Sequence, residues 1–104
     1  MEIIKTIGRR KTAVARAYLS SGKGEIKVNN RDFKEYFPSE VLQIIVKQPL
    51  MTTEKSNNFD ININVFGGGL SGQAEAIRLS IARALVELDQ ESRPALKAEG
   101  FLTR

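Results

Sequence analysis

The sequence predicts one α/β domain of the α+β type, a two-layer sandwich in which helices cover one face of a β-sheet. Residues 59–65 alternate between apolar and polar side chains, which is the two-residue period of a strand with one buried face. From residue 72 to residue 88 the apolar side chains recur every three to four positions, as in an amphipathic helix. A chain of 104 residues has room for a single domain, so we assign residues 1–104 to it.

Four stretches are expected to form strands, because their pattern is extended and turn-forming residues bound them. They are residues 3–7, 11–19, 25–28 and 59–65. The first two are either separate strands or one long strand. In the second, alanine recurs at Ala13, Ala15 and Ala17, and a face made of alanine lets another layer approach closely.

Four helical stretches are expected from the spacing of apolar side chains and from the prolines. They are residues 33–37, 40–47, 72–88 and 93–98. Pro38 is expected to end the first helix and Pro49 the second, because proline has no backbone N–H. Ser39 can cap the second helix, and residues 52–58 are predicted to form a surface loop. In the third helix the apolar stripe comprises Ile77, Ile81, Ala84, Leu85 and Leu88, with Glu75, Ser80, Arg83 and Glu87 mostly opposite.

The composition excludes several functional classes. The absence of Cys removes disulfides, zinc fingers and thiol nucleophiles, and the absence of His removes the commonest metal ligand and general base. We therefore expect no cofactor, no metal and no catalysis. No apolar stretch is long enough to cross a bilayer, and the N-terminus lacks the pattern of a signal peptide. A cytoplasmic protein without a membrane partner is expected.

The positive charge is concentrated near the N-terminus. Lys and Arg total 16 against 12 Asp and Glu, a net charge of +4. Five of the cations fall in the first sixteen residues, at Lys5, Arg9, Arg10, Lys11 and Arg16. A short basic cluster is often only a solvated charge run. Here the cluster leads into an expected strand, and Arg16 has the same parity as Arg10, which predicts a positive line across the sheet that suits RNA phosphates.

A glycine-rich segment joins an expected strand to an expected helix at residues 67–72. Gly67, Gly69 and Gly72 fit the spacing of a dinucleotide-binding loop, but no strand pattern follows residue 88 to complete that unit. A Walker loop is excluded because Gln73 stands where lysine is required. Two compatible interpretations remain: a tight turn that needs glycine, and an anion site made of free amide groups at a helix N-terminus.

Two arginines of the long helix are further candidates for RNA contact. Arg78 borders the apolar stripe and Arg83 lies on the outer face, although pairing with Glu75 or Glu87 is an alternative. Stacking of aromatic rings on bases has less support. Tyr18 is a possible platform, whereas packing in the core or at an edge explains Phe33, Tyr36, Phe37, Phe59 and Phe66 equally well.

The sequence resembles the bacterial ribosomal protein S9 family of the small subunit. Residues 8–16, Gly-Arg-Arg-Lys-Thr-Ala-Val-Ala-Arg, resemble the opening motif of that family. Residues 67–78, continuing through 81–85, resemble its glycine signature. Gln48-Pro49-Leu50 and the closing Gly100-Phe101-Leu102-Thr103-Arg104 also fit, so the resemblance covers essentially the whole chain. Asn30, where glycine is common in the family, is a minor difference.

The resemblance implies a fold like that of ribosomal protein S5 domain 2, with an unusual left-handed crossover. It also implies a structural protein in the head of the small subunit, with the 3′ major domain of its ribosomal RNA and neighbouring head proteins as partners. The positions that match the RNA interface are Arg9, Arg10, Lys11, Gly67, Gly68, Gly69, Gln73, Arg78 and Arg83.

Family members continue past the Leu-Thr-Arg stretch into a long basic tail whose end approaches the tRNA in the peptidyl site. The sequence ends at Arg104, and the tail was either removed or is not represented. Contact with peptidyl-site tRNA is therefore expected only through the absent tail.

Two other functions stay open on the residues alone. One is a nucleotide-using transferase with residues 67–72 as its phosphate loop, because the fold superfamily that the resemblance implies includes small-molecule kinases. Asp60 and Glu75 are the carboxylates it would use. The other is a protein-only adaptor, in which Arg9, Arg10 and Lys11 would be dispensable for partner binding.

Overall fold

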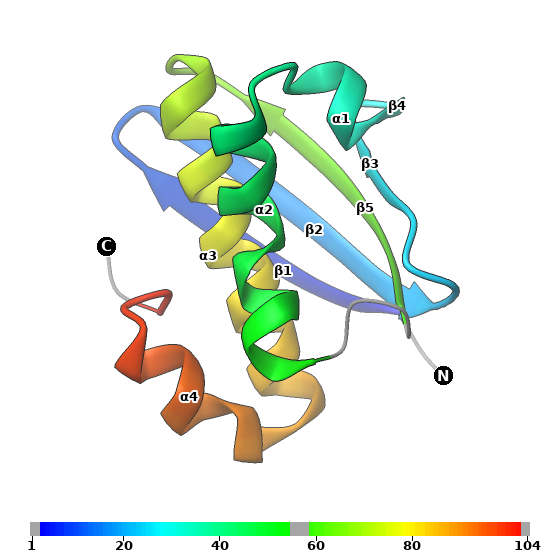
Figure 1. Ribbon diagram of the computed structural model, residues 1–104, viewed down its shortest axis with the longest axis vertical. Helices are drawn as coiled ribbons and strands as arrows, with labels where there is room; N and C mark the ends of the chain where they lie inside the picture. Colours follow the sequence, from blue (N-terminus) through cyan, green and yellow to red (C-terminus); the bar gives the residue numbers. More distant parts are fainter. Residues whose placement is uncertain (1–2, 55–58, 103–104) are drawn as a thin grey trace.

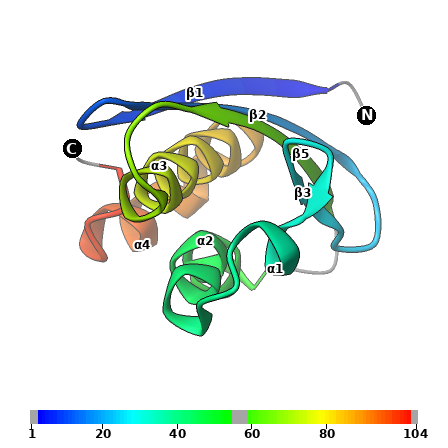
Figure 2. The same cartoon turned by 90° about the horizontal axis from the view of Figure 1, so that it is seen from above.

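A five-stranded sheet and a layer of helices on one of its faces make up the computed structural model, which describes residues 3–54 and 59–102 (Figures 1 and 2). The strands are β1 Ile4–Arg10, β2 Ala13–Ser21, β3 Ile26–Val28, β4 Arg31–Asp32 and β5 Phe59–Phe66, in the sheet order β1-β2-β5-β3-β4. The helices are α1 Phe33–Tyr36, α2 Glu40–Thr53, α3 Leu70–Leu88 and α4 Arg93–Ala98, with a 3-10 turn at Gln90–Ser92. This architecture confirms the predicted two-layer α+β sandwich.

The first two strands form a tight antiparallel hairpin. Arg10 pairs with Ala13, which leaves only Lys11 and Thr12 in the turn, and Lys11 has a φ of 55°. The alternative of one long strand is therefore wrong, and β1 runs three residues beyond its predicted end. A turn without Gly or Asn gives little local signal in the sequence.

The alanine face of β2 is where α3 packs. Ala13, Ala15 and Ala17 are fully buried, as their alternation predicted. On β1, Gly8 completes this contact, because a Cβ there would lie 2.3 Å from the Ala76 carbonyl oxygen and 2.7 Å from the Ser80 nitrogen. A side chain at position 8 would therefore force the two layers apart.

Helix α3 lies between the sheet and α2, and it is buried on both sides (Figure 2). It begins at Leu70, two residues before the predicted start. The predicted apolar stripe faces the core, but Ser80, predicted opposite it, is fully buried as well. The Ser80 hydroxyl donates to the Ile77 carbonyl at 2.8 Å, and the Ser80 carbonyl accepts from the Thr6 hydroxyl at 2.6 Å.

Helix α2 continues past the proline that was expected to end it. Pro49 lies inside the helix, which runs on to Thr53 and ends at Glu54 with a φ of 57°. Pro49 and Leu50 are both buried, so packing of the last turn against the core compensates for one missing backbone hydrogen bond. Thr52 and Thr53 therefore belong to α2 rather than to a loop. Residues 55–58 of the predicted loop lie outside the described residues.

The crossover between β3 and β5 distinguishes this fold from common α/β units. These two strands are parallel neighbours, joined through β4, α1 and α2. With the helices in front of the sheet and β5 running upward, β3 lies to the right of β5 in Figure 1. The connection is therefore left-handed, as the family resemblance implied, whereas such crossovers are almost always right-handed.

Candidate nucleic-acid interface

The tip of the β1–β2 hairpin, residues 9–12, packs against the glycine turn, residues 67–69. Gly67 and Gly68 have φ values of 80° and 61°, which favour glycine. A Cβ on Gly67 would lie 2.4 Å from the Thr12 carbonyl oxygen, and one on Gly68 would lie 3.2 Å from the Thr12 hydroxyl. All three glycines of the turn are exposed. Bare backbone and a cationic hairpin thus form one continuous surface.

The glycine turn is held from inside by Gln73. This side chain is only 9% exposed. Its Nε2 donates to the Gly67 carbonyl at 3.0 Å, and its Oε1 accepts from the Tyr36 hydroxyl at 2.7 Å. Asn29 extends the network by donating from Nδ2 to the Val65 carbonyl at 3.0 Å. Both polar atoms of the Gln73 side chain therefore have protein partners, and its predicted direct RNA contact stays untested.

The basic residues of the hairpin lie on two different faces of the sheet. Residues that are paired across neighbouring strands share a face. Arg10 pairs with buried Ala13 and so faces the helices, whereas Arg16 pairs with Ile7 on the opposite face. The predicted positive line through Arg10 and Arg16 is therefore wrong. Because the turn has two residues, odd-numbered residues of β1 share a face with even-numbered residues of β2. Arg16 therefore lies on the same face as Lys5 and Arg9.

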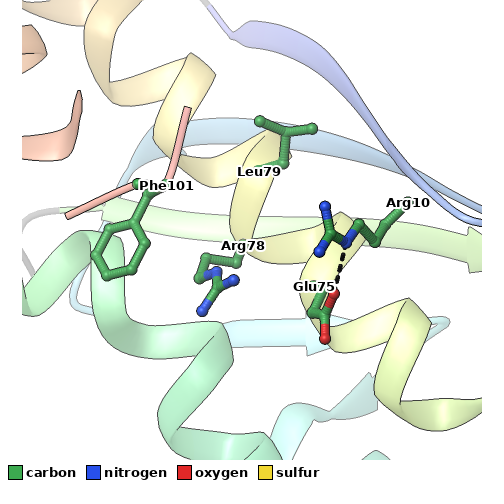
Figure 3. A pocket seen from close by; sticks show the side chains of 6 residues that line it. Arg10, Glu75, Arg78, Leu79 and Phe101 are labelled. Carbon is green, nitrogen blue, oxygen red and sulfur yellow. Dashed lines mark hydrogen bonds and ion pairs between the residues drawn. The ribbon is translucent and has the colours of Figure 1, made fainter. Parts of the chain in front are cut away.

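On the helix side, Arg10 forms an ion pair with Glu75 of α3. Arg10 Nε donates to Glu75 Oε1 at 2.6 Å. The pair lines one side of a small pocket, and Arg78 and Phe101 line the other (Figure 3). The pair is partly exposed, so solvent screens it and part of the charge of Arg10 is neutralised.

The two candidate arginines of α3 have partners other than the predicted acids. Arg78 donates to Gln48 Oε1 at 2.8 Å and lies over the Phe101 ring at 5.0 Å. Arg83 donates to the Ile7 carbonyl at 2.7 Å, on the edge strand β1. Within residues 3–54 and 59–102, neither forms an ion pair with Glu75 or Glu87.

The aromatic residues divide into buried and exposed ones. Phe33 and Phe37 are core residues, as packing predicted, but Phe66 is 57% exposed, so the packing interpretation is wrong for it. The sequence could have predicted this exposure, because Phe66 follows Asn62 and Asn64 at every second position of β5, on the exposed side of the strand. Tyr18 is partly exposed on that same face of the sheet.

Asp60 has a structural role at the opposite end of β5 from the glycine turn. Its Oδ1 accepts the backbone N–H groups of Lys23, Gly24 and Glu25 at 3.0, 3.2 and 3.0 Å. These bonds, led by that from Glu25, hold the pKa of the Asp60 carboxyl below its ordinary value. Asp60 therefore fastens the β2–β3 turn and lies away from the loop that a transferase would use.

The described residues contain neither a metal-binding group nor a membrane span. No cluster of three or more His, Cys, Asp or Glu side chains in them could hold a metal ion. None of the described helices is long and apolar enough to cross a membrane.

A cationic hairpin packed on an exposed glycine turn, carried by a small α+β scaffold, defines a domain of the structural RNA-binding class. The family described as ribosomal protein S9/S16 matches residues 8–104 of the chain. The small ribosomal subunit protein uS9 of Christiangramia forsetii is 61% identical over all 104 residues, which cover 81% of that relative. The uS9 proteins of Amoebophilus asiaticus and Porphyromonas gingivalis are 59% and 56% identical over the same shares. The chain belongs to the ribosomal protein S9 family.

Proposed function

We propose that the hairpin tip and the glycine turn hold the RNA backbone of the 3′ major domain, in the head of the small subunit. Membership of the S9 family makes the chain a structural, non-catalytic protein of the small ribosomal subunit that binds ribosomal RNA. The transferase and the protein-only adaptor are thereby set aside. The observation that carries the proposal is the contact of Gly67 and Gly68 with Thr12, beside exposed Arg9 and Lys11.

Helix α3 contributes to this surface through its N-terminus. The helix begins directly after the glycine turn, with Gly69 as its N-cap residue and no acidic residue in its first turn. The first N–H groups of a helix lack intrahelical partners, and the helix dipole favours an anion beside them. A phosphate of the RNA backbone can approach here because the glycines carry no side chains.

The remaining candidate residues support the surface in different ways. Gln73 positions the turn through its bond to Gly67, and its contact with RNA stays a prediction. Arg83 is exposed at the edge of β1, where its charge remains available to a phosphate. Arg10 and Arg78 line the pocket beside the hairpin, so RNA that follows the hairpin passes over them.

Neighbouring head proteins are further proposed partners. Val41, Ile44 and Met51 of α2 are exposed apolar side chains that such proteins could cover. Contact with tRNA in the peptidyl site is proposed for the basic tail that the family resemblance implies. We propose the cytoplasm as the location of this ribosome.

Gly69→Glu tests the proposal without disturbing the fold. A Cβ at Gly69 meets nothing within 4 Å, and its φ of −98° suits any residue. The added carboxylate would stand where a phosphate is proposed to bind, so we expect the affinity for a 3′ major domain transcript to fall at least about tenfold. Binding is measured by filter retention, with a transcript of another domain for comparison.

Ala98→Glu is the matched control for this experiment. Ala98 is exposed at the end of α4, and α4 contributes no residue to the hairpin tip or the glycine turn. It adds the same charge and should leave the affinity within about twofold. If Gly69→Glu binds the transcript as tightly as the unchanged chain, with an unchanged melting temperature, the proposed surface is wrong.

A further inference from the structure

The open face of the sheet, on the side away from the helices, carries side chains that the hairpin tip and the glycine turn do not use. The side chains concerned are Lys5, Ile7 and Arg9 on β1, Val14, Arg16 and Tyr18 on β2, and Asn62, Asn64 and Phe66 on β5. Asp60 and Lys27 lie on the same face, farther from the hairpin tip. We propose that this face binds an unpaired segment of RNA, with its cations holding phosphates and Phe66 stacking on a base. The inference rests on the proposed function, because it extends the same RNA contact onto a second surface.

The strand register arranges the open face in three cross-strand rows. Arg9, Val14 and Phe66 form the row nearest the hairpin tip; Ile7, Arg16 and Asn64 form the middle row; Lys5, Tyr18 and Asn62 form the third. Successive rows lie about 6.5 Å apart along the strands. Each of these three rows carries one cation on β1 or β2, so the positive charge is spread over three rows and ends before Asp60 in the next one.

The cations that β1 and β2 carry on the open face have no acid beside them. Lys5, Arg9 and Arg16 are exposed, and no carboxylate among residues 3–54 and 59–102 lies within ion-pair distance of them. Arg10, on the helix side, is paired with Glu75. Lys27, which pairs with Asn62 at the β3 end of the open face, lies 3.6 Å from Glu25. The unpaired charges therefore favour a polyanion as the occupant of this face.

Phe66 indicates which polyanion fits. Its ring is 57% exposed in the same row as Arg9, where hydrophobic burial alone would have favoured the core. Bases of any sequence stack on such a ring, and this stacking is the usual way in which a sheet holds single-stranded RNA. Asn62 and Asn64 add amide donors and acceptors that suit base edges. An acidic protein would use the cations but would have no need of the ring.

The open face is also continuous with the proposed RNA surface. Phe66 directly precedes Gly67, and Arg9 lies two residues before the hairpin turn. An RNA strand held at the glycine turn therefore meets the row of Arg9, Val14 and Phe66 next. A fully paired helix would reach the cations, but its bases are stacked on each other and not available to the ring.

Fluorescence titration of the full 104-residue chain tests the inference. The probe is a single-stranded oligoribonucleotide containing 2-aminopurine, whose emission is quenched by stacking. The same sequence as a duplex and a poly-L-glutamate of equal charge are the competitors. We expect Phe66→Leu to weaken single-strand binding about fivefold or more and to abolish the quenching, without changing the salt dependence. Arg16→Gln should weaken binding severalfold and reduce the salt slope by about one.

Lys97→Gln on exposed α4 is the charge-matched control and should change neither affinity nor quenching. If both open-face variants bind the single strand as the unchanged chain does, the inference is overturned. It is also overturned if the duplex or poly-L-glutamate competes as well as the single strand. Gly69→Glu separates this failure from that of the proposed function, because it alters the glycine turn and leaves the open face intact.

Discussion

Two glycines of this chain have opposite requirements, and the difference decides what each can test. At Gly8 a Cβ would overlap the backbone of α3, so this glycine sets the distance between the sheet and the helix. At Gly69 a Cβ would meet no atom within 4 Å, so no packing contact among the described residues requires glycine at this position. An exposed position that is glycine without needing to be is suited to the close approach of a ligand.

Asp60 determines part of the response of stability to pH. The pKa of its carboxyl is lowered in the folded chain by bonds from Glu25, Lys23 and Gly24, so its stabilising effect is present above the ordinary aspartate pKa of about 3.9. That effect is lost as the pH falls through the lowered pKa. We expect Asp60→Asn to unfold at a lower urea concentration at pH 7, and the difference from the unchanged chain to shrink as the pH falls below the ordinary aspartate pKa. A difference that stays constant with pH would contradict this assignment.

At the scale of elements, strongly periodic segments were predictable and tight connections were not. The alternation of β5 and the helical period of α3 each need only local sequence, and both elements formed where expected. The Lys11-Thr12 turn lacks the usual turn residues, so the sequence did not predict it. Without this turn, Arg10 and Arg16 were predicted to lie on the same face of the sheet, whereas they lie on opposite faces. Proline was expected to end α2 at Pro49, but the helix continues, because packing of the following turn outweighs the loss of one backbone hydrogen bond.

The candidate site was predictable in its residues but not in their contacts. The glycine turn and the basic cluster stood out in the sequence, since both are composition signals. The pair of Arg10 with Glu75 depends on how α3 lies against a hairpin 65 residues away, which no local pattern encodes. Phe66 could have been assigned to the exposed face by extending the alternation of β5 by one step.

The hairpin should show a conflict between stability and binding. Lys11 has a φ of 55°, a left-handed conformation that costs a residue with a side chain about 1 kcal/mol. We expect Lys11→Gly to raise the free energy of unfolding by about 0.5 kcal/mol, since glycine relieves the strain but loses more entropy on folding. The same change should weaken binding of the 3′ major domain transcript about threefold or more. Urea unfolding and filter retention measure the two effects, and a variant that is less stable or binds equally well would refute this account.

At the scale of the whole molecule, the distribution of charge matters more than its sum. A net charge of +4 is modest, yet five of the cations lie on the two strands and the turn at one edge of the sheet. The hairpin reversal divides them between the helix side and the open face. RNA that contacts both surfaces would pass around the edge of the sheet formed by β1. Arg83 lies at that same edge, where it donates a hydrogen bond to the Ile7 carbonyl.

The most direct test is the salt dependence of binding to the 3′ major domain transcript. We expect the logarithm of the affinity to fall linearly with the logarithm of salt concentration, by about 0.7 to 0.9 per phosphate neutralised. Replacing both Arg9 and Lys11 by Gln should lower that slope by about 1.4 to 1.8, whereas replacing both Arg93 and Lys97 on α4 should leave it unchanged. A flat response to salt, or equal slopes for the two double variants, would contradict RNA binding through the hairpin.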